Sequence, residues 1–153
     1  MAHNSDGVLM VVDVQVGFLN DFSAHIPGRI ARLIEGDGYD AILFTRFVNV
    51  SDSPYHRLLD WHDCAESPQT DLAHELEPFA AISRSFTKSG YTGLSDDLGQ
   101  HLRELDPRRA TIVGIDTDMC VLKIAMDVFD LGIEPVVLID CCASTAGLQA
   151  HLA

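Results

Sequence analysis

Three polar residues stand at the ends of apolar segments, where a fold could bring their side chains together for chemistry. Asp13 interrupts the first apolar segment, VLMVVDV, near its carboxyl end, and Lys88 follows the short apolar stretch AAISRSF. Cys120 lies between two apolar runs in GIDTDMCVLKIAMDVFDLG, residues 114–132. A thiol, a carboxylate and an ammonium group can perform nucleophilic catalysis, because the thiolate attacks a carbonyl carbon while the carboxylate accepts the thiol proton and returns it to the leaving group.

The ionisation of Cys120 depends on the element that carries it. In the first turn of a helix, the helix dipole and free backbone N–H groups stabilise a thiolate, and a nearby Lys88 would stabilise it further. For that arrangement we expect a thiol pKa below the ordinary value of about 8.5. Each residue also has a simpler interpretation by type alone: a core cysteine, an aspartate that caps a turn and a surface lysine.

The elements that must position these residues are apolar runs alternating with helical patterns. Four continuous apolar runs predict parallel strands covered on both faces: VLMVVDV, AILFTRFV, ATIVGI and PVVLID. Helices are predicted over IPGRIARLIEG and over LSDDLGQHLRELDP, where Ser95 can cap. The alternation predicts an α/β fold of three layers, α/β/α, with a mostly parallel, doubly wound sheet of five to six strands. Such sheets bind ligands at the carboxyl ends of their strands, which would place Asp13, Lys88 and Cys120 at one edge.

Two further segments bear on the surroundings of this edge. The segment after Cys120 has its polar residues on one narrow stripe, so we expect a helix buried on more than one side, in the core or in a subunit contact. The segment 49–78 is polar, holds three of the six prolines and predicts a surface excursion with one helical turn at HRLLDW. Excursions of this length are often lids or pocket walls.

Composition restricts the partners and the location. At 153 residues and 47% hydrophobic content, residues 1–153 are expected to form a single domain. The formal net charge of −13 argues against nucleic acid and anionic membrane surfaces and favours neutral or cationic small molecules. The first apolar run is broken by an aspartate and no basic segment precedes it, so neither a signal peptide nor a membrane span is expected. The four cysteines lack CxxC spacing, which indicates a reducing cytoplasm rather than a disulfide framework.

Three segments in order carry a family resemblance. VVDVQVGF, TKSGYTGL and VGIDTDMCVLKIAMDVFDLGIEPVVLIDCCAST resemble the signature segments of the isochorismatase-like cysteine hydrolases, which include nicotinamidases and N-carbamoylsarcosine amidase. The resemblance extends from about residue 8 to residue 145. In that family an Asp, a Lys and a Cys form a catalytic triad, and the matching positions assign these roles to Asp13, Lys88 and Cys120.

The resemblance also implies the surroundings of the triad. It implies a non-proline cis peptide between Ile115 and Asp116, and an oxyanion hole formed by the backbone N–H groups of Asp116 and Cys120. It implies Phe18 and Trp61 as apolar pocket walls. Asn49 could face the pocket by its position at the end of the second predicted strand, and Tyr91 completes the residues expected to bind the substrate.

Two departures from the family pattern limit the resemblance. Nicotinamidases hold a metal with an Asp-x-His pair after the second strand, whereas this sequence reads TRFVNVSDSPYH there, and Asp63 stands where a further histidine ligand would be. We therefore expect no metal and no cofactor, and nicotinamide is disfavoured as the substrate. The family also continues for a further helix and often a sixth strand, so this chain is expected to be short at its C-terminus.

The function predicted from these features is a metal-independent cysteine hydrolase that cleaves a small amide or related C–N bond through a thioester acyl-enzyme. Two alternatives stay open: an isochorismatase-type enol-ether hydrolase that does not use the thiol, and a catalytically inactive flavodoxin-like ligand-binding domain. The expected partners are a small amide-like molecule and further copies of the chain in a homo-oligomer, with no nucleic acid and no membrane.

Overall fold

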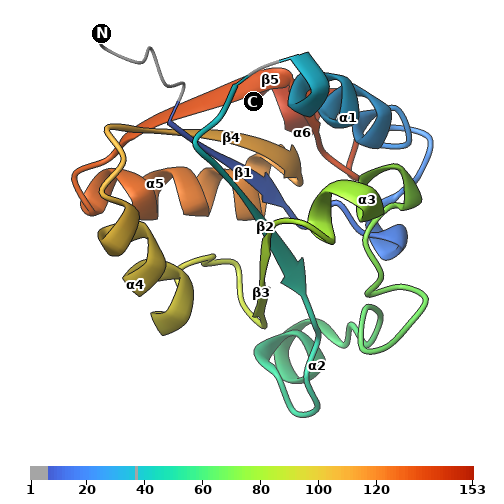
Figure 1. Ribbon diagram of the computed structural model, residues 1–153. Helices are drawn as coiled ribbons and strands as arrows, with labels where there is room; N and C mark the ends of the chain where they lie inside the picture. The colour runs from blue at the N-terminus through green and yellow to red at the C-terminus, as the bar shows by residue number, and fades with distance from the viewer. Residues whose placement is uncertain (1–6, 37) are drawn as a thin grey trace, which may run out of the picture.

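A single parallel sheet forms the centre of the computed structural model, which describes residues 7–36 and 38–153. The order of its five strands is β3-β2-β1-β4-β5, and every neighbouring pair is parallel (Figure 1). The strands are β1 (Val8–Val12), β2 (Ala41–Phe47), β3 (Arg84–Lys88), β4 (Arg109–Ile115) and β5 (Glu134–Ala143). The chain winds outward from β1 to one edge and then returns to build the other, which confirms the predicted doubly wound α/β fold.

Helices cover both faces of this sheet. The α-helices are α1 (Ile26–Gly36), α2 (Pro54–Leu59), α3 (Glu77–Ala80), α4 (Asp96–Leu105), α5 (Leu122–Asp130) and α6 (Leu148–Leu152). Three short turns complete the order: the 3-10 turns η1 (Val16–Phe18) and η2 (His74–Leu76), and the π turn η3 (Thr117–Val121). Because side chains alternate along β1, Met10 packs with α4 and α5, whereas Leu9 packs with α1 on the opposite face.

The sequence predicted the long strands but did not single out β3. The four apolar runs correspond to β1, β2, β4 and β5, which pair along the centre and the far edge of the sheet. β3 is a five-residue edge strand in which only Phe86 and Lys88 are buried. β3 alternates between exposed and buried residues and has no continuous apolar run, so the pattern used to find the other strands could not detect it. β5, the other edge strand, does have such a run, but the expectation that it is covered on both faces is wrong, because only its last three residues are buried.

The predicted helix boundaries are largely those observed. α1 covers the predicted stretch, and Ser95 caps α4 as expected, since its hydroxyl accepts a hydrogen bond from the Leu98 N–H at 3.4 Å. In the excursion, α2 begins at Pro54, two residues before the predicted turn, because Ser53 caps it by accepting a bond from the His56 N–H at 3.2 Å. Side-chain capping thus determines where these helices begin, and hydrophobic periodicity alone predicts those starts less accurately.

One face of α5 is buried against the sheet and the other face is exposed. Ile124 and Val128 are fully buried against the sheet, but Leu122, Met126 and Phe129 are more than half exposed. The expectation that this helix is buried in the core on more than one side is therefore wrong for the face that points away from the sheet. Among the described residues, no helix is long and apolar enough to cross a membrane.

Candidate active site

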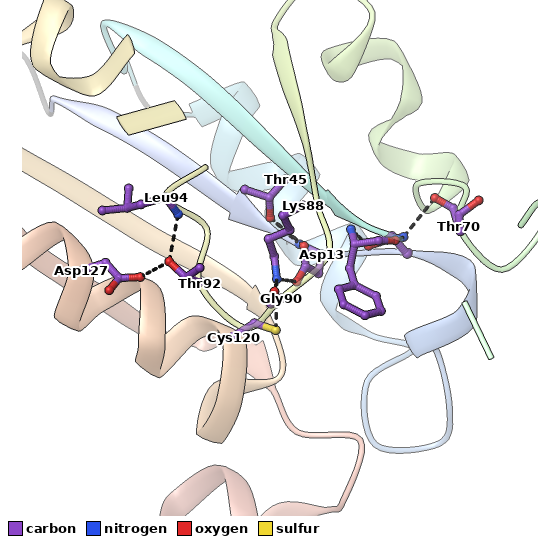
Figure 2. A network of polar contacts seen from close by, with 11 residues as sticks. Asp13, Thr45, Thr70, Lys88, Gly90, Thr92, Leu94, Cys120 and Asp127 are labelled. Atoms are coloured by element: carbon purple, nitrogen blue, oxygen red, sulfur yellow. Dashed lines mark hydrogen bonds and ion pairs between the residues drawn. The ribbon is translucent and has the colours of Figure 1, made fainter. Parts of the chain in front are cut away.

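The carboxyl ends of three strands bring the three sequence-predicted residues together. Asp13 directly follows β1, Lys88 ends β3, and Cys120 lies in η3 just after β4. The Lys88 Nζ is 2.7 Å from Asp13 Oδ2 and 3.4 Å from Cys120 Sγ. Figure 2 shows the ammonium group beside both the carboxylate and the sulfur. Since β1 and β4 lie where the strand order reverses, this is the edge at which doubly wound sheets bind ligands.

Asp13 is held as a buried, fully partnered carboxylate. Its side chain has no exposed surface, and its backbone adopts the left-handed region with φ of 49°. Thr45 Oγ1 donates a hydrogen bond to Asp13 Oδ1 at 2.7 Å, and Lys88 contacts the other oxygen. Because an unpaired buried charge is very costly, these contacts hold the carboxylate in place and fix its direction.

Lys88 connects the carboxylate to the loop that follows β3. Its side chain is 3% exposed, and its Nζ donates a hydrogen bond to the Gly90 carbonyl oxygen at 2.7 Å. Further along this loop, Thr92 Oγ1 donates to Asp127 Oδ2 of α5 at 2.5 Å and accepts from the Leu94 N–H at 3.2 Å (Figure 2). The loop is thus fixed at both ends.

The backbone before the nucleophile turn approaches β1 very closely. Gly114 has a φ of 129°, and a Cβ at this position would lie 2.1 Å from the Val12 carbonyl oxygen. Only glycine fits there, so this residue lets β4 reach the turn that carries Cys120. The peptide bond between Ile115 and Asp116, at the end of β4, is cis.

The ionisation of Cys120 differs from the expectation drawn from its position. Burial raises the pKa of the Cys120 thiol to about 12; the Asp13 charge and hydrogen bond act in the same direction, and Lys88 opposes them. The expectation of a lowered thiol pKa is therefore wrong. Desolvation disfavours the thiolate more than one ammonium group, itself paired with a carboxylate, can stabilise it. The resting group is a protonated thiol beside a carboxylate.

A pocket of about 340 Å³ opens over Cys120. Its lining residues are Gly17, Phe18, Leu19, Asn20, Phe47, Tyr55, Leu59, Trp61, Tyr91, Ile115, Asp116, Met119, Cys120 and Thr145. Three of the four predicted substrate-binding residues line it: Phe18, Trp61 and Tyr91. Three residues of the excursion, Tyr55, Leu59 and Trp61, form part of its wall.

Asn49, the fourth predicted substrate-binding residue, is not among the residues that line this pocket. It is 2% exposed, and its Nδ2 donates to the carbonyl oxygens of Trp61 and Asp63, each at 3.0 Å. Its Oδ1 accepts from Ser53 Oγ at 2.7 Å. The structure does not support the predicted contact between Asn49 and a substrate, because the Asn49 amide is hydrogen-bonded within the excursion that carries Trp61.

The Asp116 carboxylate faces the segment after β5 and is held there by one residue. Its Oδ1 accepts from the Thr145 N–H at 2.6 Å, and its Oδ2 accepts from Thr145 Oγ1 at 3.0 Å. Burial raises the pKa of this carboxyl, while the hydrogen bonds from Thr145 oppose the shift. The Thr145 carbonyl oxygen accepts from Asn20 Nδ2 at 3.0 Å, which connects the turn to the opposite pocket wall.

Sequence reasoning missed several residues that shape the site. Gln15 is fully buried; its Nε2 donates to the carbonyl oxygens of Phe47 and Thr70 at 2.8 and 3.0 Å, and its Oε1 accepts from the Phe47 N–H at 2.7 Å. This amide joins the end of β2 to the returning excursion. A glutamine two residues after Asp13 in an apolar segment was the available signal, whereas Thr45 and Thr145 carried none.

The residues near the excursion do not fit a metal site of the kind that nicotinamidases use. The rings of His56 and His62 lie 4.3 Å apart, and His62 Nε2 is 2.9 Å from Asp60 Oδ1. Within residues 7–36 and 38–153, however, no group of three or more His, Cys, Asp or Glu side chains could hold a metal ion. No catalytic step is assigned to a metal.

These features define a class: a doubly wound α/β protein with a thiol, a carboxylate and an ammonium group beneath one pocket. The isochorismatase domain matches residues 7–153, so the chain belongs to the isochorismatase family of hydrolases. The resemblance drawn from the three sequence segments is thereby confirmed.

Three solved structures share the fold. The isochorismatase-like hydrolase from Alkaliphilus metalliredigens has a TM-score of 0.83 at 18% identity and covers 97% of this chain and 87% of its own. The N-carbamoylsarcosine amidase from Thermoplasma acidophilum has a TM-score of 0.79 at 22% identity, over 90% of this chain and 83% of its own. The pyrazinamidase/nicotinamidase from Streptococcus mutans has a TM-score of 0.81 at 23% identity, over 96% and 92%.

One curated relative is similar over a shorter stretch. Isochorismatase domain-containing protein 2 of Xenopus laevis is 29% identical over 62 residues, which are 40% of this chain and 30% of the frog protein. The match thus spans about a third of that relative.

Proposed function

We propose that the protein is a metal-independent cysteine hydrolase that cleaves a small amide or related C–N bond through a thioester acyl-enzyme. The observation that carries the proposal is the contact of one buried ammonium group with both other members, at 2.7 Å to Asp13 Oδ2 and 3.4 Å to Cys120 Sγ, beneath an accessible pocket. Cys120 is the proposed nucleophile, Asp13 the general base and then acid, and Lys88 the electrostatic partner of both.

The proposed first half-reaction forms the thioester. Asp13 accepts the thiol proton as Cys120 Sγ attacks the amide carbonyl carbon, which gives a tetrahedral oxyanion. The N–H groups of Asp116 and Cys120, residues that line the pocket, are the proposed donors to that oxyanion. Asp13 then returns the proton to nitrogen, the C–N bond breaks and ammonia or an amine leaves. A thiol whose pKa is raised to about 12 needs such a base, because it does not ionise by itself near neutral pH.

The second half-reaction regenerates the thiol. Asp13 accepts a proton from water as the water oxygen attacks the thioester carbonyl carbon. The C–S bond breaks, sulfur takes up the proton from Asp13, and the carboxylic acid product leaves. Through both halves the Lys88 ammonium stays within contact of the groups that exchange the proton, which limits the cost of moving charge in a buried site.

The amide proposal is favoured over the enol-ether alternative by the charge of the pocket. An enol-ether substrate of the isochorismate type is a dicarboxylate and requires cationic partners when it is removed from water. No lysine or arginine is among the described residues that line the pocket, whereas Asp116 is. A dicarboxylate would therefore be poorly held over Cys120, and an uncharged amide would not.

The test is a screen of small amides with detection of released ammonia. Cys120→Ala and Cys120→Ser should both lose turnover of any substrate found, by at least about a thousandfold, because the covalent route is removed. Cys141→Ala is the matched control: Cys141 is 7% exposed and lies outside the pocket, so activity should be retained. Activity of Cys120→Ser equal to that of the unmodified protein would contradict the thioester route, provided both variants keep the far-UV circular dichroism of the fold.

Two wider features complete the proposal. We propose a homo-oligomer in which a second copy of the chain covers the exposed face of α5, because Leu122, Met126 and Phe129 present an apolar surface there. We also propose a reducing cytoplasm as the location, because all four cysteines, each within the described residues, are free.

A further inference from the structure

The pocket above Cys120 has a wall of five aromatic rings. Trp61 is the centre of this aromatic wall: its ring lies 6.3 Å from Phe18 and 5.9 Å from Phe47, both stacked, and 5.8 Å from Tyr55 in an edge-on arrangement. Tyr91 continues the wall from Tyr55 at 5.2 Å. The five rings come from η1, β2, the excursion and the loop after β3, so their convergence is a property of the fold.

Part of the aromatic wall is accessible to a ligand. Phe47 and Tyr55 are buried and form the back of the wall, whereas Phe18 and Trp61 are half-buried and Tyr91 is 43% exposed. Ring faces carry negative partial charge and attract cations that approach within about 6 Å of the centroid. The wall already has a cation at its inner side, because Lys88 Nζ lies 5.4 Å from the Phe47 centroid.

The charges around the pocket favour a positive group. Asp116 is the one charged side chain among the described residues that line it, and its two oxygens accept hydrogen bonds from Thr145. The Lys88 ammonium below is already paired with Asp13, so it leaves no net positive charge for an anionic ligand. The adjoining hollow, which shares Tyr91 and Met119 with the pocket, is lined by Asp118 and by Lys123, and Lys123 is paired with Asp127.

The pKa values of Tyr55 and Asp116 are both raised by the surroundings of the pocket. Burial raises the pKa of Tyr55 well above its usual value, and the Asp13 charge contributes to the rise. Beside burial, the Asp118 and Asp13 charges contribute to the raised pKa of Asp116. With a formal charge of −13 on the whole chain, the field in the pocket attracts cations.

We propose that the substrate of this site is a cationic amide, in which a quaternary ammonium or pyridinium group lies against the aromatic wall while the amide carbonyl lies over Cys120. This inference rests on the proposed function, because it assigns the substrate class of the same site. A quaternary nitrogen has no hydrogen bond to lose on leaving water, so ring faces can replace its hydration.

The test compares two amides of the same shape that differ in charge. Trimethylammonioacetamide carries the quaternary nitrogen, and 3,3-dimethylbutanamide has carbon in its place. Trp61 is the single tryptophan of the chain, so its fluorescence reports directly on occupancy of the pocket. With Cys120→Ala, which cannot turn the amides over, the cation should bind about tenfold more tightly than its neutral isostere at low salt.

Two variants separate the aromatic wall from general charge attraction. Phe18→Leu keeps the Trp61 reporter and removes one accessible ring face, so the preference for the cation should fall several-fold. Phe22→Leu is the matched control, because Phe22 is 54% exposed and lies outside this pocket, and the preference should be unchanged. Equal or tighter binding of the neutral isostere overturns the inference, and so does the absence of saturable quenching with either amide.

The same compounds distinguish this inference from the proposed function. If the unmodified protein hydrolyses the neutral amide in a Cys120-dependent reaction without preferring the cation, the hydrolase proposal stands and the cationic substrate is refuted. If the cation binds preferentially but no ammonia is released, the ligand preference stands and the proposed hydrolysis of this compound class fails.

Discussion

The pKa of the Cys120 thiol offers the most direct test of the site, because burial and Asp13 raise it together to about 12. At pH 8.5, a thiol of that pKa has roughly a thousandfold smaller thiolate fraction than an ordinary thiol of pKa about 8.5. Since the thiolate is the species that reacts with iodoacetamide, alkylation of Cys120 in the free protein should be slow. Its rate should rise about tenfold per pH unit between pH 7 and pH 10, with no plateau.

The assay is peptide mass spectrometry of carbamidomethylated Cys120, timed against a free cysteine peptide in the same tube. Asp13→Asn removes the largest electrostatic cause of the shift and leaves Lys88 in place. This variant should therefore alkylate faster at every pH below 10 while losing amide hydrolysis, because it also loses the general base. A plateau in the wild-type rate below pH 8, or slower alkylation of Asp13→Asn, would refute the argument that desolvation and the carboxylate dominate.

Two further predictions concern stability and assembly. Lys88→Met leaves Asp13 charged and unpaired in a site where the two side chains are 3% and 0% exposed. It should lower the free energy of unfolding in urea by about 3–5 kcal/mol, and adding Asp13→Asn should restore part of the loss; a cost under about 1 kcal/mol would contradict the buried pair. Met126→Glu places a charge on the exposed face of α5 and should shift sedimentation from oligomer to monomer, while the control Ile82→Glu, at a site 86% exposed, should not. A monomeric wild-type protein would remove the proposed interface.

Much of the architecture could be predicted from local patterns. Continuous apolar runs are typical of strands buried on both faces, and these runs located four of the five strands, although one of them, β5, is a partly exposed edge strand. The end of an apolar run is also the place where a parallel sheet presents polar side chains, which is why the sequence could place Asp13 and Cys120 at the same edge of the sheet. β3 was not located because its five residues alternate between exposed and buried and include no apolar run, unlike β5 at the other edge.

The composition of the site was harder to predict than its location. Asn49 was a plausible substrate contact by position, but its amide is used by backbone groups that only the folded excursion brings to it. Thr145 lies 29 positions from Asp116 and yet holds both oxygens of its carboxylate. Side-chain hydrogen bonds across such separations depend on register and loop path, which hydrophobic periodicity does not encode.

The amino-acid sequence by itself determined the strand–helix alternation, the edge of the sheet that carries the site and the membership of the three segments in one family. The tertiary structure decided the raised pKa of the Cys120 thiol and the convergence of the rings of the aromatic wall. It also decided that the Asn49 amide holds the excursion instead of contacting a substrate. The physical reason is the range of the interactions involved. Strand and helix patterns arise from neighbours a few residues apart, whereas desolvation and electrostatic fields depend on every group that packs around a side chain, however distant along the chain.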